Sequence, residues 1–264
     1  MKVGSLFSGF GLMDLGLQQA GMEIVWQVEN NEYAQKVLEK HWPGLRRWDD
    51  VRTFPPEPIE EWRVDLISGG FPCTDISNAG KRKGIGGPSS GLWTEMFRII
   101  CLLRPRCVLV ENVGALRNRG LGRVLGDLAG IGYDSEWESL QAWTFGAAHI
   151  RERIFIAAYP KSDNGPRRKW HDQIKKKRQA KVRHSKSHPV ADTNWDNPQT
   201  RIFRAGREIL SLPLPCRGTD QPGVDRVAYA VPHRMERLVG LGNGVFVPCA
   251  QWIGERIMEA EANR

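Results

Sequence analysis

Short apolar runs alternate with helical patterns up to about residue 160 of the chain. The strand-like runs are residues 2–7, 23–28, 64–67, 107–110 and 153–159. The helical patterns are residues 12–20, 31–42, 92–104 and 121–129. Apolar positions recur at helical spacing within these patterns, and Gly21 and Pro43 end the first two. Strands and helices that alternate in this way predict an α/β fold with a doubly wound sheet.

Polar or glycine-containing loops follow four of the predicted strands. The residues concerned are 8–11, Glu29, 69–73 and Glu111. In a doubly wound sheet, ligands bind beyond the carboxyl ends of the strands. We therefore expect these four loops to surround one crevice.

The alternation stops at about Pro160 and returns near Arg234. Between them the chain has scattered Pro, several His and Trp, and a run of basic residues, which predicts a small irregular region. Helical patterns resume over residues 234–241 and 247–260. The pattern therefore divides the chain into three segments: 1–160, 161–222 and 223–264.

Positive charge is concentrated in one short part of the chain. The formal net charge is +8 at pH 7. Residues 161–190 contain eleven Lys and Arg against two Asp, a net +9, so that all other residues together carry −1. A basic segment on a nearly neutral body is typical of an element that binds a polyanion.

Composition excludes several classes of protein. With 41% hydrophobic and 26% charged residues among 264, the chain is not globally disordered. No apolar run approaches the ~18 residues that a membrane span needs, and the first residues lack the long apolar stretch of a signal peptide. The five cysteines form no C-x-x-C pair, which argues against a disulfide framework or a zinc site. We expect a cytoplasmic protein that uses neither a membrane nor a metal.

The loop Phe7-Ser8-Gly9-Phe10-Gly11 has the pattern of a nucleotide-binding turn. Its glycines would let a ligand approach the backbone at the start of a helix, although a tight strand-to-helix connection has the same pattern. Glu29 stands where an acidic side chain accepts hydrogen bonds from a ribose, with a helix cap as the alternative. Residue 14 is Asp, so the second half of a dinucleotide motif is missing. S-adenosylmethionine therefore fits this loop as well as NAD.

Cys73 closes the loop Gly69-Gly70-Phe71-Pro72-Cys73, which opens onto the expected crevice. That position favours a nucleophilic thiol, and a buried structural cysteine is the alternative. The buried role is the one expected for the cysteines on apolar faces, Cys101 and Cys107.

Charged side chains are predicted beside this thiol. Glu111 ends the neighbouring strand, where it would either approach Cys73 or cap a helix. Arg151 and Arg153 are two residues apart, so both would face the crevice if they lie on one strand. Otherwise they would form a solvated face.

Five motifs of this chain resemble those of the cytosine-5 DNA methyltransferase family, in the same order. They are Phe7-Ser8-Gly9-Phe10-Gly11, Gly70-Phe71-Pro72-Cys73, Glu111-Asn112-Val113, Arg151-Glu152-Arg153 and Gly242-Asn243-Gly244-Val245. The resemblance covers about residues 1–160 and 222–260 and is to small bacterial or phage-type members. It implies a Rossmann-like, S-adenosylmethionine-dependent methyltransferase sheet, in a bacterial cell or a phage-infected host.

The resemblance implies methyl transfer to carbon 5 of a cytosine that is flipped out of duplex DNA. Cys73 would add to carbon 6 and so make carbon 5 nucleophilic. Glu111 would supply a proton or a hydrogen bond to ring nitrogen 3. Arg153 would bind the carbonyl oxygen of the base, supported by Arg151.

The implied cofactor site draws on both ends of the chain. Its residues are Phe7, Ser8, Gly9, Gly11, Leu12, Glu29, Asp50, Val51, Pro72, Trp93, Asn243 and Val245. Glu29 would bind the ribose of S-adenosylmethionine, and Asp50 and Val51 the edge of its adenine. Residues 1–160 would then form the catalytic and cofactor-binding domain, to which residues 223–264 return.

Residues 161–222 would form a short target-recognition region of a monomeric enzyme that acts on double-stranded DNA. The candidates for phosphate contacts within it are Lys175, Lys176, Lys177 and Arg178. Several positions depart from the family pattern. Ser5 stands where Asp is usual, Thr74 and His149 stand where Gln is usual, and Ile76 stands where an aromatic residue is usual.

Three other functions compete with this interpretation. A tRNA cytosine-5 methyltransferase would have the same motifs, but a separate insert favours DNA. A catalytically inactive nucleic-acid-binding relative would not need Cys73, Glu111 and Arg153 together. A dinucleotide oxidoreductase would need the missing half of the glycine motif.

Overall fold

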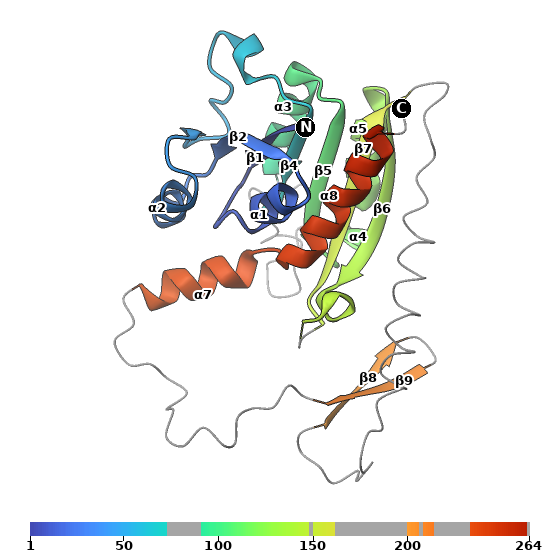
Figure 1. Ribbon diagram of the computed structural model, residues 1–264. Coiled ribbons are helices and arrows are strands. Elements are labelled where there is room, and N and C mark those ends of the chain that lie inside the picture. The colour runs from blue at the N-terminus through green and yellow to red at the C-terminus, as the bar shows by residue number, and fades with distance from the viewer. Residues whose placement is uncertain (73–90, 148–149, 162–199, 206–207, 214–232, 263–264) are drawn as a thin grey trace.

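A sheet of seven strands runs through the part of the protein that the computed structural model describes (Figure 1). The described residues are 1–72, 91–147, 150–161, 200–205, 208–213 and 233–262. The strands are β1 (Lys2–Leu6), β2 (Glu23–Val28), β3 (Arg46–Trp48), β4 (Leu66–Gly69), β5 (Cys107–Val113), β6 (Tyr133–Gln141) and β7 (Glu152–Pro160). Their order is β3-β2-β1-β4-β5-β7-β6. Neighbours from β3 to β5 are parallel, whereas β7 is antiparallel to both β5 and β6.

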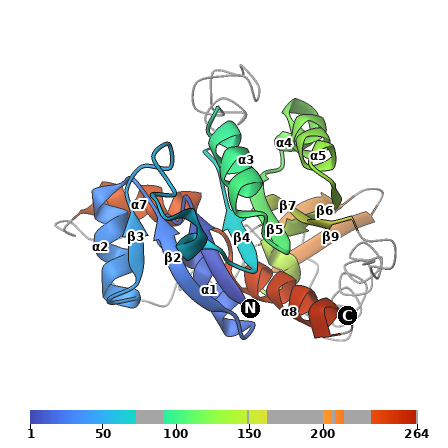
Figure 2. The same ribbon diagram turned by 90° about the horizontal axis from the view of Figure 1, so that it is seen from above.

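Helices cover both faces of this sheet (Figure 2). The α-helices are α1 (Leu12–Gln19), α2 (Glu32–His41), α3 (Leu92–Leu103), α4 (Leu116–Arg119), α5 (Leu121–Gly130), α7 (Arg234–Asn243) and α8 (Val247–Ala262), and the 3-10 helices are η1 (Ile59–Trp62) and η3 (Ala142–Phe145). α3 and α5 pack on one face around buried Met96 and Val124. α1 and α8 pack on the other around Leu17 and Ile253. This arrangement confirms the predicted doubly wound α/β fold.

The local sequence explains where the first two helices begin. Asn31 accepts a 2.9 Å hydrogen bond from the backbone N–H of Ala34 and so caps α2. Gly11 precedes α1 with a φ of 73°, a left-handed conformation that glycine adopts without steric cost. Both helices therefore start beside the carboxyl ends of the strands that they follow.

Gly4 on β1 pairs directly with Trp26 on β2. A Cβ at residue 4 would lie 1.9 Å from Cζ2 of Trp26, so the indole fills the space that any side chain there would need. Trp26 is buried and packs against Phe54, with 4.8 Å between the ring centroids. The glycine thus allows the sheet to seat a very large aromatic residue in the core.

The structure corrects several predicted boundaries. β3 and β6 were not expected, because β3 is three residues long with two Arg, and β6 is a polar edge strand without a continuous apolar run. β4 begins at Leu66, two residues later than expected. β5 continues past Glu111 to Val113 because it pairs there with β7.

Two further strands lie in the region that was expected to be irregular. β8 (Thr200–Ala205) and β9 (Glu208–Pro213) form an antiparallel pair. The division of the chain at residues 160 and 222 stays a prediction. No helix within the described ranges has the length and apolar character needed to span a membrane.

Candidate active site

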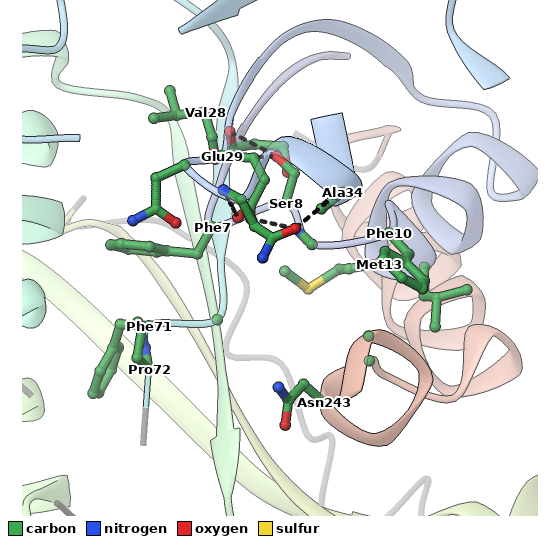
Figure 3. A pocket seen from close by; sticks show the side chains of 18 of the residues that line it. Phe7, Ser8, Phe10, Met13, Val28, Glu29, Ala34, Phe71, Pro72 and Asn243 are labelled. Carbon is green, nitrogen blue, oxygen red and sulfur yellow. Dashed lines mark hydrogen bonds between the residues drawn. The ribbon is translucent and has the colours of Figure 1, made fainter. Parts of the chain in front are cut away.

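A cavity of about 770 Å³ lies at the carboxyl ends of β1, β2, β4 and β5 (Figure 3). β1 stands between β2 and β4. The chain first adds β2 and β3 on one side of β1, and it then adds β4 and β5 on the other side. Doubly wound sheets bind ligands at such a switch point. The cavity wall contains residues from each of the four loops singled out in the sequence: Ser8, Glu29, Pro72 and Glu111.

A carboxylate from the loop after β2 holds the loop after β1 (Figure 3). Glu29 accepts hydrogen bonds from the backbone N–H of Gly9, at 2.7 Å, and from that of Asn31, at 2.9 Å. Each carboxylate oxygen can accept two hydrogen bonds, and Glu29 lines the cavity. It can therefore fix the loop and still bind a hydroxyl group of a ligand.

Most residues predicted for the cofactor site line this cavity. They are Phe7, Ser8, Gly9, Leu12, Glu29, Asp50, Val51, Pro72, Asn243 and Val245. Gly11 is not part of the wall, since it serves as the N-cap of α1. Trp93 is also outside, because it is 1% exposed, packs against Phe71 and donates from its indole N–H to Asp127 at 2.8 Å. The prediction for Trp93 is corrected: it supports the wall residue Phe71 from behind.

The cavity also has wall residues that the sequence analysis did not single out. Asp14 comes from α1, and Met235 and Val239 come from α7. α7 lies against the first loop, since a Cβ at Gly240 would meet the ring of Phe10 at 2.1 Å. The helical pattern of this segment predicted α7, but the pattern alone could not tell which partner its apolar side chains would meet.

Acidic groups dominate the charged part of the wall. Among the residues that the structure describes, six carboxylates and two guanidinium groups line the cavity: Asp14, Glu29, Asp49, Asp50, Glu111 and Glu236, and Arg52 and Arg153. Apolar side chains, among them Phe7 and Phe71, form much of the rest. Such a wall suits a ligand that combines an apolar ring with a net positive charge.

Glu111 and Arg153 form an ion pair at the edge of this cavity. Oε1 of Glu111 lies 3.0 Å from Nε of Arg153, and the two side chains are 12% and 16% exposed. Val113 is the direct partner of Arg153 on β5, so Glu111 is its diagonal neighbour. A Cβ at Gly70 would lie 2.7 Å from Oε2 of Glu111. The absence of a side chain at residue 70 therefore gives the carboxyl group its place.

Burial raises the pKa of Glu111 to about 7, although the positive charges of Arg153 and Arg151 act in the opposite direction. Near neutral pH a large fraction of this carboxyl group is therefore protonated. It can donate a hydrogen bond or a proton to a ligand, which an ordinary surface glutamate could not do.

Arg151 does not face the cavity with Arg153. Its φ is 30° and it precedes the first residue of β7, Glu152, so the alternation of the strand does not extend to it. Its guanidinium donates to the carbonyl oxygen of Gly242 at 2.7 Å and also to that of Gly244. Both arginines would face the crevice only if they lay on one strand, and this condition is not met because β7 begins at Glu152. Arg151 instead holds the turn between α7 and α8.

Asn112 fixes the backbone just before Pro72. Its Nδ2 donates to the carbonyl oxygen of Phe71 at 3.0 Å, and its side-chain oxygen accepts from the N–H of Val113 at 2.9 Å. Asn112 is buried. The sequence motif indicated a role only for its Glu, and the positioning of the neighbouring loop by the Asn is visible only in the structure.

Two groups of predicted residues lie outside the described residues: the nucleophile candidate Cys73, and the basic run Lys175, Lys176, Lys177 and Arg178. Pro72, which precedes Cys73, lines the cavity together with Glu111 and Arg153. Within the described ranges, no group of three or more His, Cys, Asp or Glu is placed to hold a metal ion.

Comparison with known proteins assigns this arrangement to a family. Residues 1–205 match the family model of the C-5 cytosine-specific DNA methylases. The chain belongs to this family. The resemblance inferred from the five motifs is thereby confirmed.

Two members of the family illustrate the extent of the match. The Type II methyltransferase M2.BsuMI of Bacillus subtilis (strain 168) is 35% identical over 166 residues, which cover 60% of this chain and 42% of the relative. M.FnuDI, a Type II methyltransferase of Fusobacterium nucleatum, is 34% identical over 168 residues, which cover 62% and 48%. The matched part thus spans less than half the length of either relative.

Solved structures share the fold of this chain. A protein described as a DNA modification methyltransferase encoded within a prophage (E. coli) has a TM-score of 0.52 and 26% identity, and the match covers 61% of this chain and 47% of that one. A mutant of Spodoptera frugiperda DNMT2 has a TM-score of 0.54 and 24% identity, with 64% and 53% covered.

Proposed function

We propose that this chain is a DNA (cytosine-5-)-methyltransferase that uses S-adenosylmethionine. The observation that carries the proposal is the buried pair of Glu111 and Arg153, which opens onto the same cavity as the loop held by Glu29. One cavity thus joins a carboxyl group that can donate a proton to a nucleobase with a loop of the nucleotide-binding type. Membership of the C-5 DNA methylase family supports cytosine as the base.

The net charge of S-adenosylmethionine is complementary to that of the cavity wall. Its sulfonium and ammonium groups outweigh its carboxylate, so the molecule is a cation, and the wall has an excess of carboxylates. Glu29 would accept hydrogen bonds from the ribose, Asp50 and Val51 would face the adenine, and Asn243 would contribute from the turn after α7. When bound, the cofactor supplies an electrophilic methyl group.

Residues of the chain would activate the cytosine. The thiolate of Cys73 adds to carbon 6, electrons move toward ring nitrogen 3, and carbon 5 becomes nucleophilic. Glu111 donates a proton to nitrogen 3, which its raised pKa permits at neutral pH. Arg153 holds Glu111 in place and would bind the carbonyl oxygen of the base.

Elimination would complete the reaction. Once carbon 5 bears the methyl group, a base removes its proton, and the electrons of that C–H bond form the ring double bond and expel the thiolate of Cys73. Glu111 takes back the proton from nitrogen 3. The target nucleotide must first leave the duplex, because the stacked neighbours enclose carbons 5 and 6.

The proposed partner is double-stranded DNA, bound by a monomer in the cytoplasm of a bacterial cell or a phage-infected host. The charge of residues 161–190, +9 in total, supports a polyanionic partner. Lys175, Lys176, Lys177 and Arg178 are the proposed phosphate contacts.

A mechanism-based trap tests the proposal. In duplex DNA that contains 5-fluorocytosine, carbon 5 has no proton to lose after methylation, so a denaturation-resistant adduct should accumulate with S-adenosylmethionine. Cys73→Ala should abolish the adduct, and Cys101→Ala, on α3, should retain it. An adduct that survives in Cys73→Ala would sink the assignment of the nucleophile. If the tritium-labelled methyl group of S-adenosylmethionine were transferred to bulk tRNA and not to duplex DNA, the proposed substrate would be wrong.

A further inference from the structure

Asp14 is a buried carboxylate in the cavity wall for which the proposed chemistry has no use. It lies in the first turn of α1, is 0% exposed and belongs to the lining of the cavity. Its Oδ1 accepts from the hydroxyl of Ser5 at 2.6 Å, and its Oδ2 accepts from the side-chain amide of Gln27 at 2.8 Å. A donor on each oxygen favours the ionised form of the carboxyl group.

The hydrogen bonds around Asp14 run toward it. The hydroxyl of Ser8 donates to that of Ser5 at 2.9 Å, and Ser5 in turn donates to Asp14. The single O–H of Ser8 is used in its hydrogen bond to Ser5. Only the lone pairs of the Ser8 oxygen are therefore left to accept hydrogen bonds from a ligand in the cavity that Ser8 lines. This part of the wall therefore offers negative charge and acceptors to a ligand.

The charge of Asp14 is not neutralised by a neighbour. Within the described residues, no Lys or Arg forms an ion pair with it, whereas Glu111 pairs with Arg153. Arg47 is connected to Asp14 only through Gln27, to which it donates at 3.1 Å, and Arg47 itself pairs with Glu39. Burial raises the pKa of Asp14 to about 6, opposed by its two hydrogen bonds, so the group is ionised at pH 8.

We propose that Asp14 determines the preference of the cavity for a cationic cofactor over the neutral product of the reaction. The inference rests on the proposed function. S-adenosylmethionine and S-adenosylhomocysteine differ by one methyl group and one positive charge, and a carboxylate at a distance responds to the charge alone. Because Asp14 is fully buried, solvent screens its charge little, and the attraction at a given distance is stronger than it would be in water. Asp14 therefore acts without contacting the sulfur. Methyl transfer removes the charge, which favours exchange of the product for fresh cofactor.

Equilibrium binding to the full chain tests this role without any methylation assay. Calorimetry at pH 8 would compare S-adenosylmethionine and S-adenosylhomocysteine in the wild type and in Asp14→Asn, which keeps the shape and removes the charge. The Kd of S-adenosylmethionine should rise about tenfold, and that of S-adenosylhomocysteine far less. An equal loss for both ligands, or no loss, would overturn the inference.

Glu60→Gln is the matched control, because it removes a carboxylate at an exposed position outside the cavity wall, where solvent screens the charge. The ratio of the two dissociation constants should stay at the wild-type value. If this variant shifts the ratio as much as Asp14→Asn does, the preference belongs to the total charge of the protein and the role assigned to Asp14 is wrong.

The double variant Ser5→Asp with Asp14→Asn guards against a simple folding defect. It returns a carboxylate to the wall next to its original place, since the hydroxyl of Ser5 lies 2.6 Å from Oδ1 of Asp14. The preference for the cation should return with it. A folded double variant that keeps the ratio of Asp14→Asn would refute the charge mechanism. If the wild type bound neither ligand, the proposed function would fail; normal wild-type binding with an unchanged ratio in the variants removes only this inference.

Discussion

The guanidinium of Arg151 donates a 2.7 Å hydrogen bond to the carbonyl oxygen of Gly242, although 91 residues separate them. It also donates to the carbonyl oxygen of Gly244. Asn243 stands between these glycines and lines the cavity. The two arginines of the motif therefore serve different ends of the site: Arg153 holds Glu111, and Arg151 holds the turn that presents Asn243.

Arg151→Ala should weaken the binding of S-adenosylmethionine by about tenfold, in line with the loss of one charged hydrogen-bond donor at a partly exposed site. Arg153→Ala should leave that affinity within a few-fold and slow methyl transfer, because its contact is with Glu111. Calorimetry and single-turnover methylation separate the two effects. If Arg151→Ala slowed only the chemical step, its contact with Gly242 would have no bearing on the cofactor.

Glu111→Gln should slow methyl transfer by on the order of 100-fold, with cofactor affinity retained, because its proton matters only as the adduct forms. The wild-type rate should fall as pH rises through about 7, where ionisation of Glu111 removes that proton. The fall should be absent in the variant. Single-turnover rates at saturating cofactor check this, and an identical pH profile in both proteins would assign the proton to another group.

The free energy of unfolding should also depend on pH through the raised pKa of Glu111. Folding raises the pKa of Glu111 from 4.5 to about 7, so the folded chain binds this proton more tightly than the unfolded chain does. The free energy of unfolding therefore falls as pH rises between these values, by up to about 3 kcal/mol from this group. Glu111→Gln should flatten the fall by a comparable amount. Urea denaturation at the two ends of the range measures it, and parallel curves would contradict the burial of the charge.

Gly70→Ala should slow methyl transfer about tenfold or more, because its Cβ would lie 2.7 Å from Oε2 of Glu111 and push the carboxyl group aside. Gly122→Ala is the control. It adds the same methyl group on α5, where nothing lies within 4 Å, and helix propensity favours Ala there. Rates that are equal in the two variants would mean that Glu111 tolerates displacement.

Replacing Lys175, Lys176, Lys177 and Arg178 by Ala should flatten the dependence of DNA affinity on salt. Each lost phosphate contact removes ~0.9 from the slope of log affinity against log salt, so the slope should change by several units. Target and non-target duplexes should lose affinity alike. Lys36→Ala with Lys40→Ala, on the exposed side of α2, is the control. A slope that stays the same in the quadruple variant would place the DNA track on another face.

The sequence predicted the parts of this site that depend on strand ends and glycines. Glu29, Pro72 and Glu111 follow from strands that end beside one another at a switch point. Side-chain direction was harder to predict. Trp93 lies one position after Leu92, which lines the cavity, and the turn of α3 carries it behind the wall. Arg151 escaped the alternation of β7 because its backbone leaves the extended region.

Asp14 was beyond sequence reasoning for a different reason. The sequence showed it only as a residue that breaks a dinucleotide motif. Its role depends on Ser5 and Gln27, which approach it from β1 and β2. Contacts between elements that are distant in the chain leave no periodic signal, so a network of this kind becomes visible only in the folded protein.

The pairing of Gly4 with Trp26 constrains how relatives of this chain can diverge. A side chain at position 4 is compatible only with a residue smaller than Trp at position 26, because the two side chains would occupy the same space between β1 and β2. The two positions should therefore covary among homologues. A lineage that acquires a large residue at position 4 must first replace Trp26 by a smaller residue and tolerate a less tightly packed core. The opposite order would place two bulky groups in one space, so substitutions here should occur in a fixed sequence.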